Sequence, residues 1–189
     1  MKKWKKITIF VVLAAVAVFA LYLALQWPVY PDFSKYVDTF DELSAPFEDS
    51  SVIFLPQEDD IPASEYQILL DNRYLLSEPV GYCISKDAND GAVSIHYSLR
   101  CGEQNATPCD GTEEYHGVAF ETLIFPQSEQ SASRSVNVNF DIAGVPYRFY
   151  ASYSTADLGE EEIAEMDAKT EAQLFEYATQ VIDQYHANA

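Results

Sequence analysis

The chain begins with its longest apolar stretch. Residues 7–25 form nineteen positions without a charge and with only two hydroxyl groups, on Thr8 and Tyr22. A helix of that length, at about 1.5 Å per residue, spans roughly the ~30 Å hydrocarbon core of a bilayer. The only two tryptophans, Trp4 and Trp27, flank the stretch, and indole rings prefer the headgroup regions. The pattern predicts a transmembrane anchor with Trp4 and Trp27 at the two membrane interfaces.

The flanking charges set the predicted orientation. Four lysines precede the apolar stretch within residues 1–6, and no basic residue follows it directly. Positive flanks stay cytoplasmic, so residues 1–6 are a cytoplasmic tail and the C-terminal part is extracytoplasmic. A cleaved signal peptide is the alternative, because residues 18–20 offer small side chains at the cleavage positions. The apolar run continues past that site, which favours an uncleaved anchor over secretion.

The next segment predicts a short link and a helix. Residues 26–32 contain two prolines and form an exit segment that cannot continue the helix. From residue 33 to residue 189 we expect one domain. Its first apolar side chains recur at helical spacing, with acidic residues opposite, and predict an amphipathic helix that Pro46 ends; they are Phe33, Tyr36, Val37, Phe40 and Leu43.

Beyond this helix the apolar period changes from 3.6 to 2, which is typical of strands. Short apolar runs at residues 51–55 and 66–70 predict two of them. Residues 80–85 and 93–100 alternate between apolar and polar side chains. The turn-forming residues 87–91, which end in Asp-Gly, lie between these runs and predict an antiparallel hairpin.

A second hairpin is predicted further along. Residues 118–125 form another strand, and residues 136–142 and 145–153 alternate on either side of an Ala-Gly turn. Pro146 lies near the start of the last strand. Because proline cannot donate to a ladder, it predicts an edge position for this hairpin.

The chain ends with a predicted packing helix. Thr170 and Gln173 have the spacing of a capping box, and the acidic run at residues 160–165 offers an earlier start. An apolar stripe between Leu174 and Tyr185 is expected to pack on the sheet. The whole pattern predicts an α+β class: an N-terminal transmembrane helix, then an antiparallel sheet with a short helix before it and a C-terminal helix on it.

Charge narrows the classes of partner. All thirty acidic residues lie at or beyond Asp32, whereas only seven of the eleven basic residues do, so this part carries seven minus thirty, or −23. Such a surface repels nucleic acid and anionic lipid. We expect no nucleic-acid binding. The charge serves either solubility or a cationic partner.

Three cysteines lie in the predicted extracytoplasmic part, where disulfides persist. Cys101 and Cys109 are separated by a turn-forming stretch and form the expected disulfide. An odd number leaves Cys83 over. It is interpreted as a buried, unreactive thiol rather than a redox or intermolecular one.

No pattern predicts catalysis or a metal site. Residues 87–91 resemble the start of a calcium loop, but the distal glutamate is missing, so a hairpin turn explains them better. The acidic residues 58–60 are interpreted as a solvated loop. His96, His116 and His186 have no zinc-ligand spacing. We expect no catalytic residue, no cofactor and no metal ligand, and therefore no enzyme.

The pattern Val-Asn-Phe-Asp-Ile-Ala-Gly-Val-Pro-Tyr at residues 138–147, followed by the helix at residues 174–185, resembles the end of uncharacterised membrane-anchored extracytoplasmic domains of Gram-positive bacteria. The resemblance implies a small α+β domain and carries over no site residue. The leading hypothesis is a non-enzymatic module that binds an envelope protein or a cationic ligand. A signalling ectodomain acting through a membrane partner and an enzyme of unrecognised type are the alternatives.

Overall fold

A computed structural model describes residues 13–19, 34–57, 65–71, 78–102, 109, 111, 113–125 and 132–188. Within these ranges no helix is both long enough and apolar enough to cross a bilayer. Residues 13–19 are helical. The rest of the predicted anchor at residues 7–25, both tryptophans, Trp4 and Trp27, and the exit segment 26–32 lie outside the described residues.

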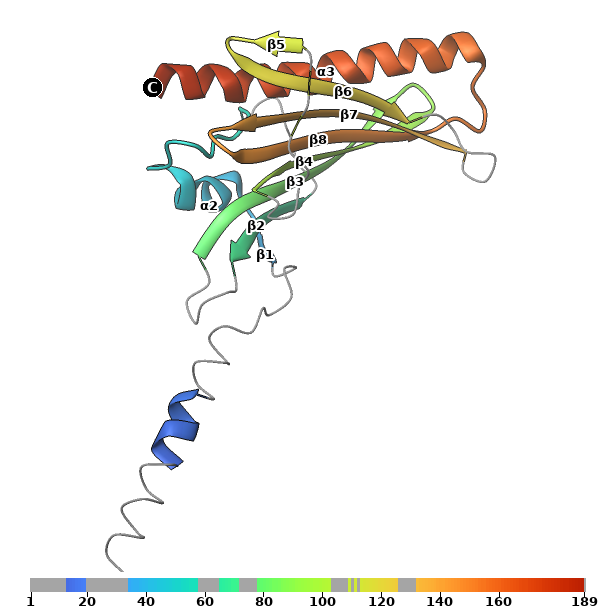
Figure 1. Ribbon diagram of the computed structural model, residues 1–189. Coiled ribbons are helices and arrows are strands. Elements are labelled where there is room, and N and C mark those ends of the chain that lie inside the picture. The colour runs from blue at the N-terminus through green and yellow to red at the C-terminus, as the bar shows by residue number, and fades with distance from the viewer. Residues whose placement is uncertain are drawn as a thin grey trace, which may run out of the picture.

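The domain is built on one eight-stranded sheet in which all neighbouring strands are antiparallel (Figure 1). The order across the sheet is β1-β2-β3-β4-β8-β7-β6-β5. The strands are β1 (Ser34–Val37), β2 (Glu65–Asp71), β3 (Glu78–Asp90), β4 (Val93–Cys101), β5 (Glu113–Tyr115), β6 (Val118–Phe125), β7 (Ser133–Ile142) and β8 (Val145–Ser154).

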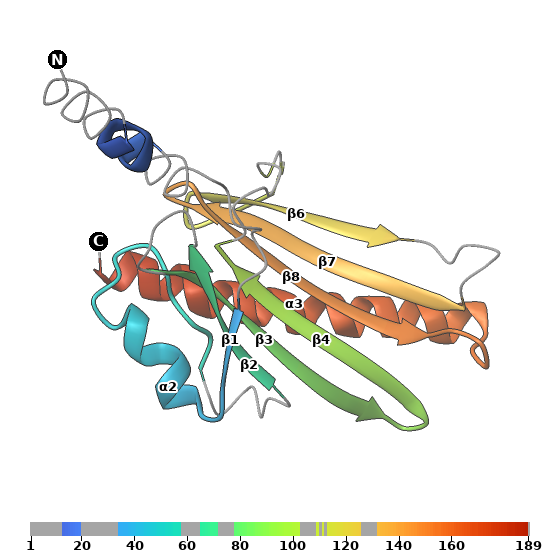
Figure 2. The same cartoon turned by 90° about the horizontal axis from the view of Figure 1, so that it is seen from below.

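Helices cover one face of this sheet. The long helix α3 (Glu160–Asn188) packs against β6, β7 and β8 and crosses behind the strands in Figure 2. The helix α2 (Phe40–Ser44) packs beside β1 and β2, and the 3-10 helix η1 (Ala45–Phe47) follows α2 directly. The largest fully buried side chains between the layers are aromatic: Tyr82, Tyr147, Tyr177, Phe140 and Phe149. The predicted α+β class with a C-terminal packing helix is confirmed.

Both predicted hairpins are present. β3 and β4 are joined by Gly91-Ala92, and Gly91 has a φ of +59°. β7 and β8 are joined by Ala143-Gly144, whose φ values are +49° and +84°. Tight two-residue hairpin turns of this kind need positive φ, which glycine adopts without strain. The turn residues therefore fixed both hairpins locally.

The predicted edge position of the second hairpin is wrong, because β8 lies between β4 and β7. Pro146 is the second residue of β8, and the ladder with β4 ends at the pair Cys101–Tyr147. The proline nitrogen thus lies beyond the last β4 pair, and the Pro146 carbonyl accepts a hydrogen bond from the Gly102 nitrogen at 2.9 Å, so proline interrupts the ladder only at its end.

The first predicted helix is also corrected. Residues 34–37 form strand β1, which pairs with β2, and the helix is limited to α2. Thr39 caps it by accepting a hydrogen bond from the Glu42 nitrogen at 3.2 Å. The helical spacing misled because buried Val37 and Leu43 belong to two elements that reach one core. The helix α2 ends at Ser44, just before Pro46. Pro46 itself lies in the first turn of η1, where proline is tolerated.

The predicted strand at residues 51–55 pairs with no described strand and has no regular structure. Two buried tyrosines of the sheet satisfy its backbone instead. The Tyr147 hydroxyl accepts a hydrogen bond from the Phe54 nitrogen and donates one to the Val52 carbonyl, both at 2.9 Å. The Tyr82 hydroxyl donates to the Phe54 carbonyl at 2.9 Å. Tertiary contacts thereby replace the ladder that a strand would need.

Helix α3 starts at Glu160, as the acidic run suggested, and not at Thr170. Thr170 is fully buried and donates to the Met166 carbonyl at 2.6 Å, inside the helix. Arg134 of β7 fastens the N-terminal half of α3 to the sheet. Its Nε donates to the Asp167 carboxylate at 2.8 and 2.6 Å, and the Tyr153 hydroxyl donates to the same carboxylate at 2.7 Å. The hydrogen bond to Asp167 raises the pKa of Arg134.

Candidate functional site

The face of the sheet opposite α3 is polar, and we call it the open face. No helix in the described part of the chain lies on it (Figure 2). The strand registers bring serine, asparagine and tyrosine side chains together on this face, namely Ser85, Ser98, Tyr150, Ser152, Asn137 and Asn139. A polar outer face is the ordinary state of an antiparallel sheet with one solvated side. Polarity alone therefore does not identify a binding site.

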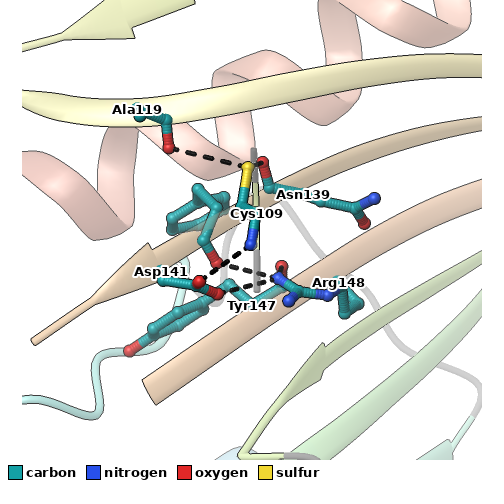
Figure 3. A network of polar contacts seen from close by, with 7 residues as sticks. Cys109, Ala119, Asn139, Asp141, Tyr147 and Arg148 are labelled. Atoms are coloured by element: carbon teal, nitrogen blue, oxygen red, sulfur yellow. Dashed lines mark hydrogen bonds and ion pairs between the residues drawn. The ribbon is translucent and has the colours of Figure 1, made fainter. Parts of the chain in front are cut away.

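Cys109 is fixed onto the open face by the network in Figure 3. The Cys109 nitrogen donates to Asp141 Oδ2 at 3.0 Å, and the thiol donates to the Asn139 carbonyl at 3.2 Å. Arg148 Nη1 donates to Asp141 Oδ1 at 3.1 Å and to the carbonyl oxygens of Phe140 and Tyr147 at 3.1 and 2.7 Å. These hydrogen bonds all join parts of the same chain, so the network holds Cys109 on the sheet.

The predicted disulfide is not formed, and all three cysteines are free thiols. Cys101 lies in β4 and is fully buried, opposite Tyr82 and Tyr147 in the neighbouring strands. Cys109 belongs to the network on the open face. The two residues thus occupy different layers, although a turn-forming stretch separates them in sequence. Burial raises the pKa of Cys101 to about 12 and also raises the pKa of Cys109.

Cys83 is buried, as its interpretation required, with 5% of its surface exposed. Its sulfur lies 3.5 Å from the hydroxyl of Ser98, across the β3–β4 pair. The side chain thus lies on the open-face side yet is covered by its neighbours. Low accessibility makes a thiol slow to react with oxidants or other thiols.

The hairpin interpretation of residues 87–91 holds, because strand β3 runs to Asp90 and Gly91 starts the turn. His96 lies directly across from Asp87, with 2.8 Å between Nδ1 and Oδ1. The side chains of His96 and Asp87 are 46% and 66% exposed, and such surface pairs contribute little stability. The acidic residues 58–60 lie outside the described part.

The other two histidines meet in space, which the sequence did not reveal. The rings of His116 and His186 have centroids 5.6 Å apart, and Tyr115 stacks on His116 at 4.3 Å. They come from the turn after β5 and from the last turn of α3. Among the described residues, no group of three or more histidine, cysteine or acidic side chains is arranged to hold a metal ion.

The most distinctive surface feature is the outer edge of β6. β5 pairs with β6 only from Val118 to Phe120. Gly111 then lies against the backbone between Phe120 and Glu121, since a Cβ on Gly111 would be 2.0 Å from the Phe120 carbonyl oxygen. Beyond that point, no strand within the described ranges pairs with residues 122–125 on the side away from β7.

A groove of about 300 Å³ runs between this edge and α3. The aromatic rings of Phe120 and Phe175 meet at 5.0 Å at one end of it. Thr122 and two exposed alanines of α3, Ala168 and Ala172, line the rest. The volume is at the small end of the range for ligand pockets, roughly 300–1,000 Å³. The groove therefore suits side chains of a bound segment better than a whole cofactor.

A second groove, of about 480 Å³, lies at the other end of the covered face. The segment 50–57 and the C-terminal end of α3 line it, and they are joined by two hydrogen bonds. Gln184 Nε2 donates to the Leu55 carbonyl at 2.7 Å, and the Gln57 nitrogen donates to Gln180 Oε1 at 3.0 Å. These bonds fasten two elements of the same chain, which makes this groove a seam within the fold.

Comparison with known proteins gives no match to a family model, to a curated protein or to a solved structure.

Proposed function

We propose that this protein is a single-pass membrane protein whose extracytoplasmic domain is a non-enzymatic binding module of the cell envelope, and that partners dock at the β6 edge. The observation that carries the docking site is residues 122–125 of β6, which pair with no described strand on the side away from β7 and lie beside a groove. Such an edge offers backbone donors and acceptors to another chain. The groove next to it offers contacts for alternate side chains.

The anchor is supported by the charge-free residues 7–25 and the four lysines before them. The structure adds that apolar side chains of the helical residues 13–19 are largely exposed, including Leu13 at 62% and Phe19 at 60%. An apolar helix that meets no core in its own domain is stabilised by burial in lipid or against another protein.

Topology is tested with a membrane-impermeant maleimide on intact spheroplasts. We expect one labelled site in the native chain, because Cys83 and Cys101 are 5% and 0% exposed and Cys109 is the accessible thiol. The Cys109→Ser variant is the control and should lose the label. Labelling only after lysis would contradict the outward orientation. A mature mass that lacks the apolar run would replace the anchor with a secreted domain.

Docking is tested by placing a photo-crosslinking amino acid at Phe125, which is 53% exposed at the β6 edge, in intact cells. The matched control is Tyr36, an exposed aromatic residue on the opposite edge strand, β1. We expect one discrete adduct from position 125 and none from position 36. Equal adducts from both positions, or none from either, would overturn docking at β6.

A further inference from the structure

The two edges of the sheet differ in how they are protected. β1 has four residues, carries Lys35 and packs beside α2. Short length, a lysine and a covering helix are the usual devices that keep an edge from pairing with other chains. Residues 122–125 of β6 read Thr-Leu-Ile-Phe and contain no charge and no proline. Ile124 and Phe125 are 40% and 53% exposed. Glu121 and Pro126 flank this stretch, but within the described part of the chain residues 122–125 themselves have neither a charge nor a covering helix.

The groove lies where the side chains of an added strand would point. Alternate residues of β6, Thr122 and Ile124, face the helix side of the sheet, because they pair with the buried Val138 and Val136. Side chains of a strand added next to them would point to the same side in alternation. There they would meet the small side chains of α3 in the groove. Edge and groove together match the geometry of strand addition with side-chain selection.

Charge defines the chemistry of the occupant. Glu113 of β5 and Glu171 of α3 both line the groove. In the described part of the chain neither carboxylate has a hydrogen bond or an ion pair, and no basic residue lines this groove. A bound Lys or Arg would bring opposite charge to both. A second copy of the chain fits poorly, because two domains of net charge −23 repel each other.

We infer that the β6 edge binds an extended peptide segment of a partner protein, which adds a strand beside residues 122–125 and places a Lys or Arg side chain near Glu113 and Glu171. This inference rests on the proposed docking at β6 and adds the chemical class of the partner. The aliphatic stem of that Lys or Arg packs on Phe120 and Phe175 in the groove. The apolar side chains between the basic ones point to the other face of the sheet, where they meet Leu123 and Phe125, and the backbone of the segment pairs with residues 122–125.

The test uses the full-length chain in non-ionic detergent and a fluorescent peptide, Thr-Val-Lys-Val-Arg-Val-Thr. Anisotropy should report binding that weakens about two- to five-fold with Glu113→Gln and again with Glu171→Gln, as expected for loss of one partly exposed ion pair. The matched controls are Glu114→Gln and Glu165→Gln, which remove the same charge at exposed positions outside the groove. They should leave binding within two-fold.

Two further measurements locate the site. Ala172→Trp fills the groove from an exposed helix position, which the fold tolerates, and should weaken binding more than ten-fold. Amide hydrogen exchange should slow within residues 122–125 when the peptide is present. Protection at another part of the chain would overturn the assigned site.

Other outcomes separate this inference from the proposed function. Equal binding of a peptide with Glu in place of Lys and Arg would overturn the cationic assignment. Concentration-dependent dimers that protect residues 122–125, with no peptide binding, would make a second copy the occupant and overturn it as well. If the adduct from Phe125 forms in cells while the charge variants change nothing, docking at β6 stands and only the partner chemistry fails.

Discussion

The two faces of the sheet use their polar groups in opposite ways. On the covered face, polar atoms are few and buried, and they bind other parts of the chain, as in the contacts of Asp167 and Tyr147. On the open face, serine and asparagine side chains are numerous and partly exposed. A buried polar group costs free energy unless it is hydrogen-bonded, whereas an exposed one exchanges its bonds with water. The covered face therefore contributes most of the stability, and the open face tolerates change away from the Cys109–Asp141–Arg148 network.

The substitution expected to destabilise the covered face most is Asp167→Ala. Asp167 is 6% exposed, and loss of its carboxylate leaves the Arg134 guanidinium without its ion pair and the Tyr153 hydroxyl with only its longer bond to the Ile163 carbonyl, at 3.2 Å. We expect the free energy of unfolding to fall by about 3 kcal/mol in urea denaturation. Glu165→Ala, at an exposed position of the same helix, should change it by less than about 0.5 kcal/mol. A loss below about 1 kcal/mol for Asp167→Ala would show that the pair contributes little.

A comparison of two tyrosines isolates a single oxygen. Tyr147→Phe removes the hydroxyl that binds the Phe54 nitrogen and the Val52 carbonyl, and should cost about 2 kcal/mol. Tyr150→Phe makes the same change on the open face, where no described hydrogen bond is lost. Its effect should stay within about 0.5 kcal/mol. Equal effects in thermal or urea unfolding would remove the proposed difference between the faces.

Neighbouring residues of β8 give the reverse test. Ala151 is fully buried on the covered face, and Ser152 points to the open face. Ala151→Ser buries a hydroxyl in an apolar layer and should lower stability by about 1–2 kcal/mol. Ser152→Ala should be neutral within about 0.5 kcal/mol. A tolerated Ala151→Ser would indicate that this hydroxyl finds a partner by rearrangement.

The smallest expected effect is the response to alkaline pH. Burial raises the pKa of Cys101 from its ordinary 9.0 to about 12. The unfolded thiol therefore ionises first, and stability is complete below pH 9 and is lost as pH rises toward 12. Between pH 8 and pH 10 this thiol should account for about 1 kcal/mol. Cys101→Ala should flatten the decline in urea unfolding, and an unchanged slope would assign it to Tyr82 and Tyr147, whose pKa values burial also raises.

The errors of prediction share one cause. The expected helix from residue 33, the strand at residues 51–55, the edge position of Pro146 and the disulfide Cys101–Cys109 all depend on partners distant in sequence. Residues 51–55 have the apolar character of a strand, but two tyrosines more than twenty-five residues away bind their backbone. The short strand β5, whose sequence carries no apolar alternation, was missed for the same reason.

The candidate site was even less accessible to sequence reasoning than the fold. Residues 118–125 were predicted as a strand. Their sequence does not indicate that β5 pairs with only three of these residues. Glu113 and Glu171 lie far apart in the chain and belong to different elements, and only the packing of α3 beside β6 brings them to one groove. The run Thr-Leu-Ile-Phe without a charge or a proline was the one visible signal.

By itself, the sequence determined the two hairpins, the alternation that separates the faces, and the apolar stripe of the C-terminal helix. These follow from local sterics, since turn residues, side-chain period and backbone conformation act within a few positions. The tertiary structure alone decided the order of the strands, the exposed part of β6 and the partners of the buried polar groups. An edge is defined by the absence of a neighbour among the described strands, and that depends on long-range pairing, which no local pattern encodes.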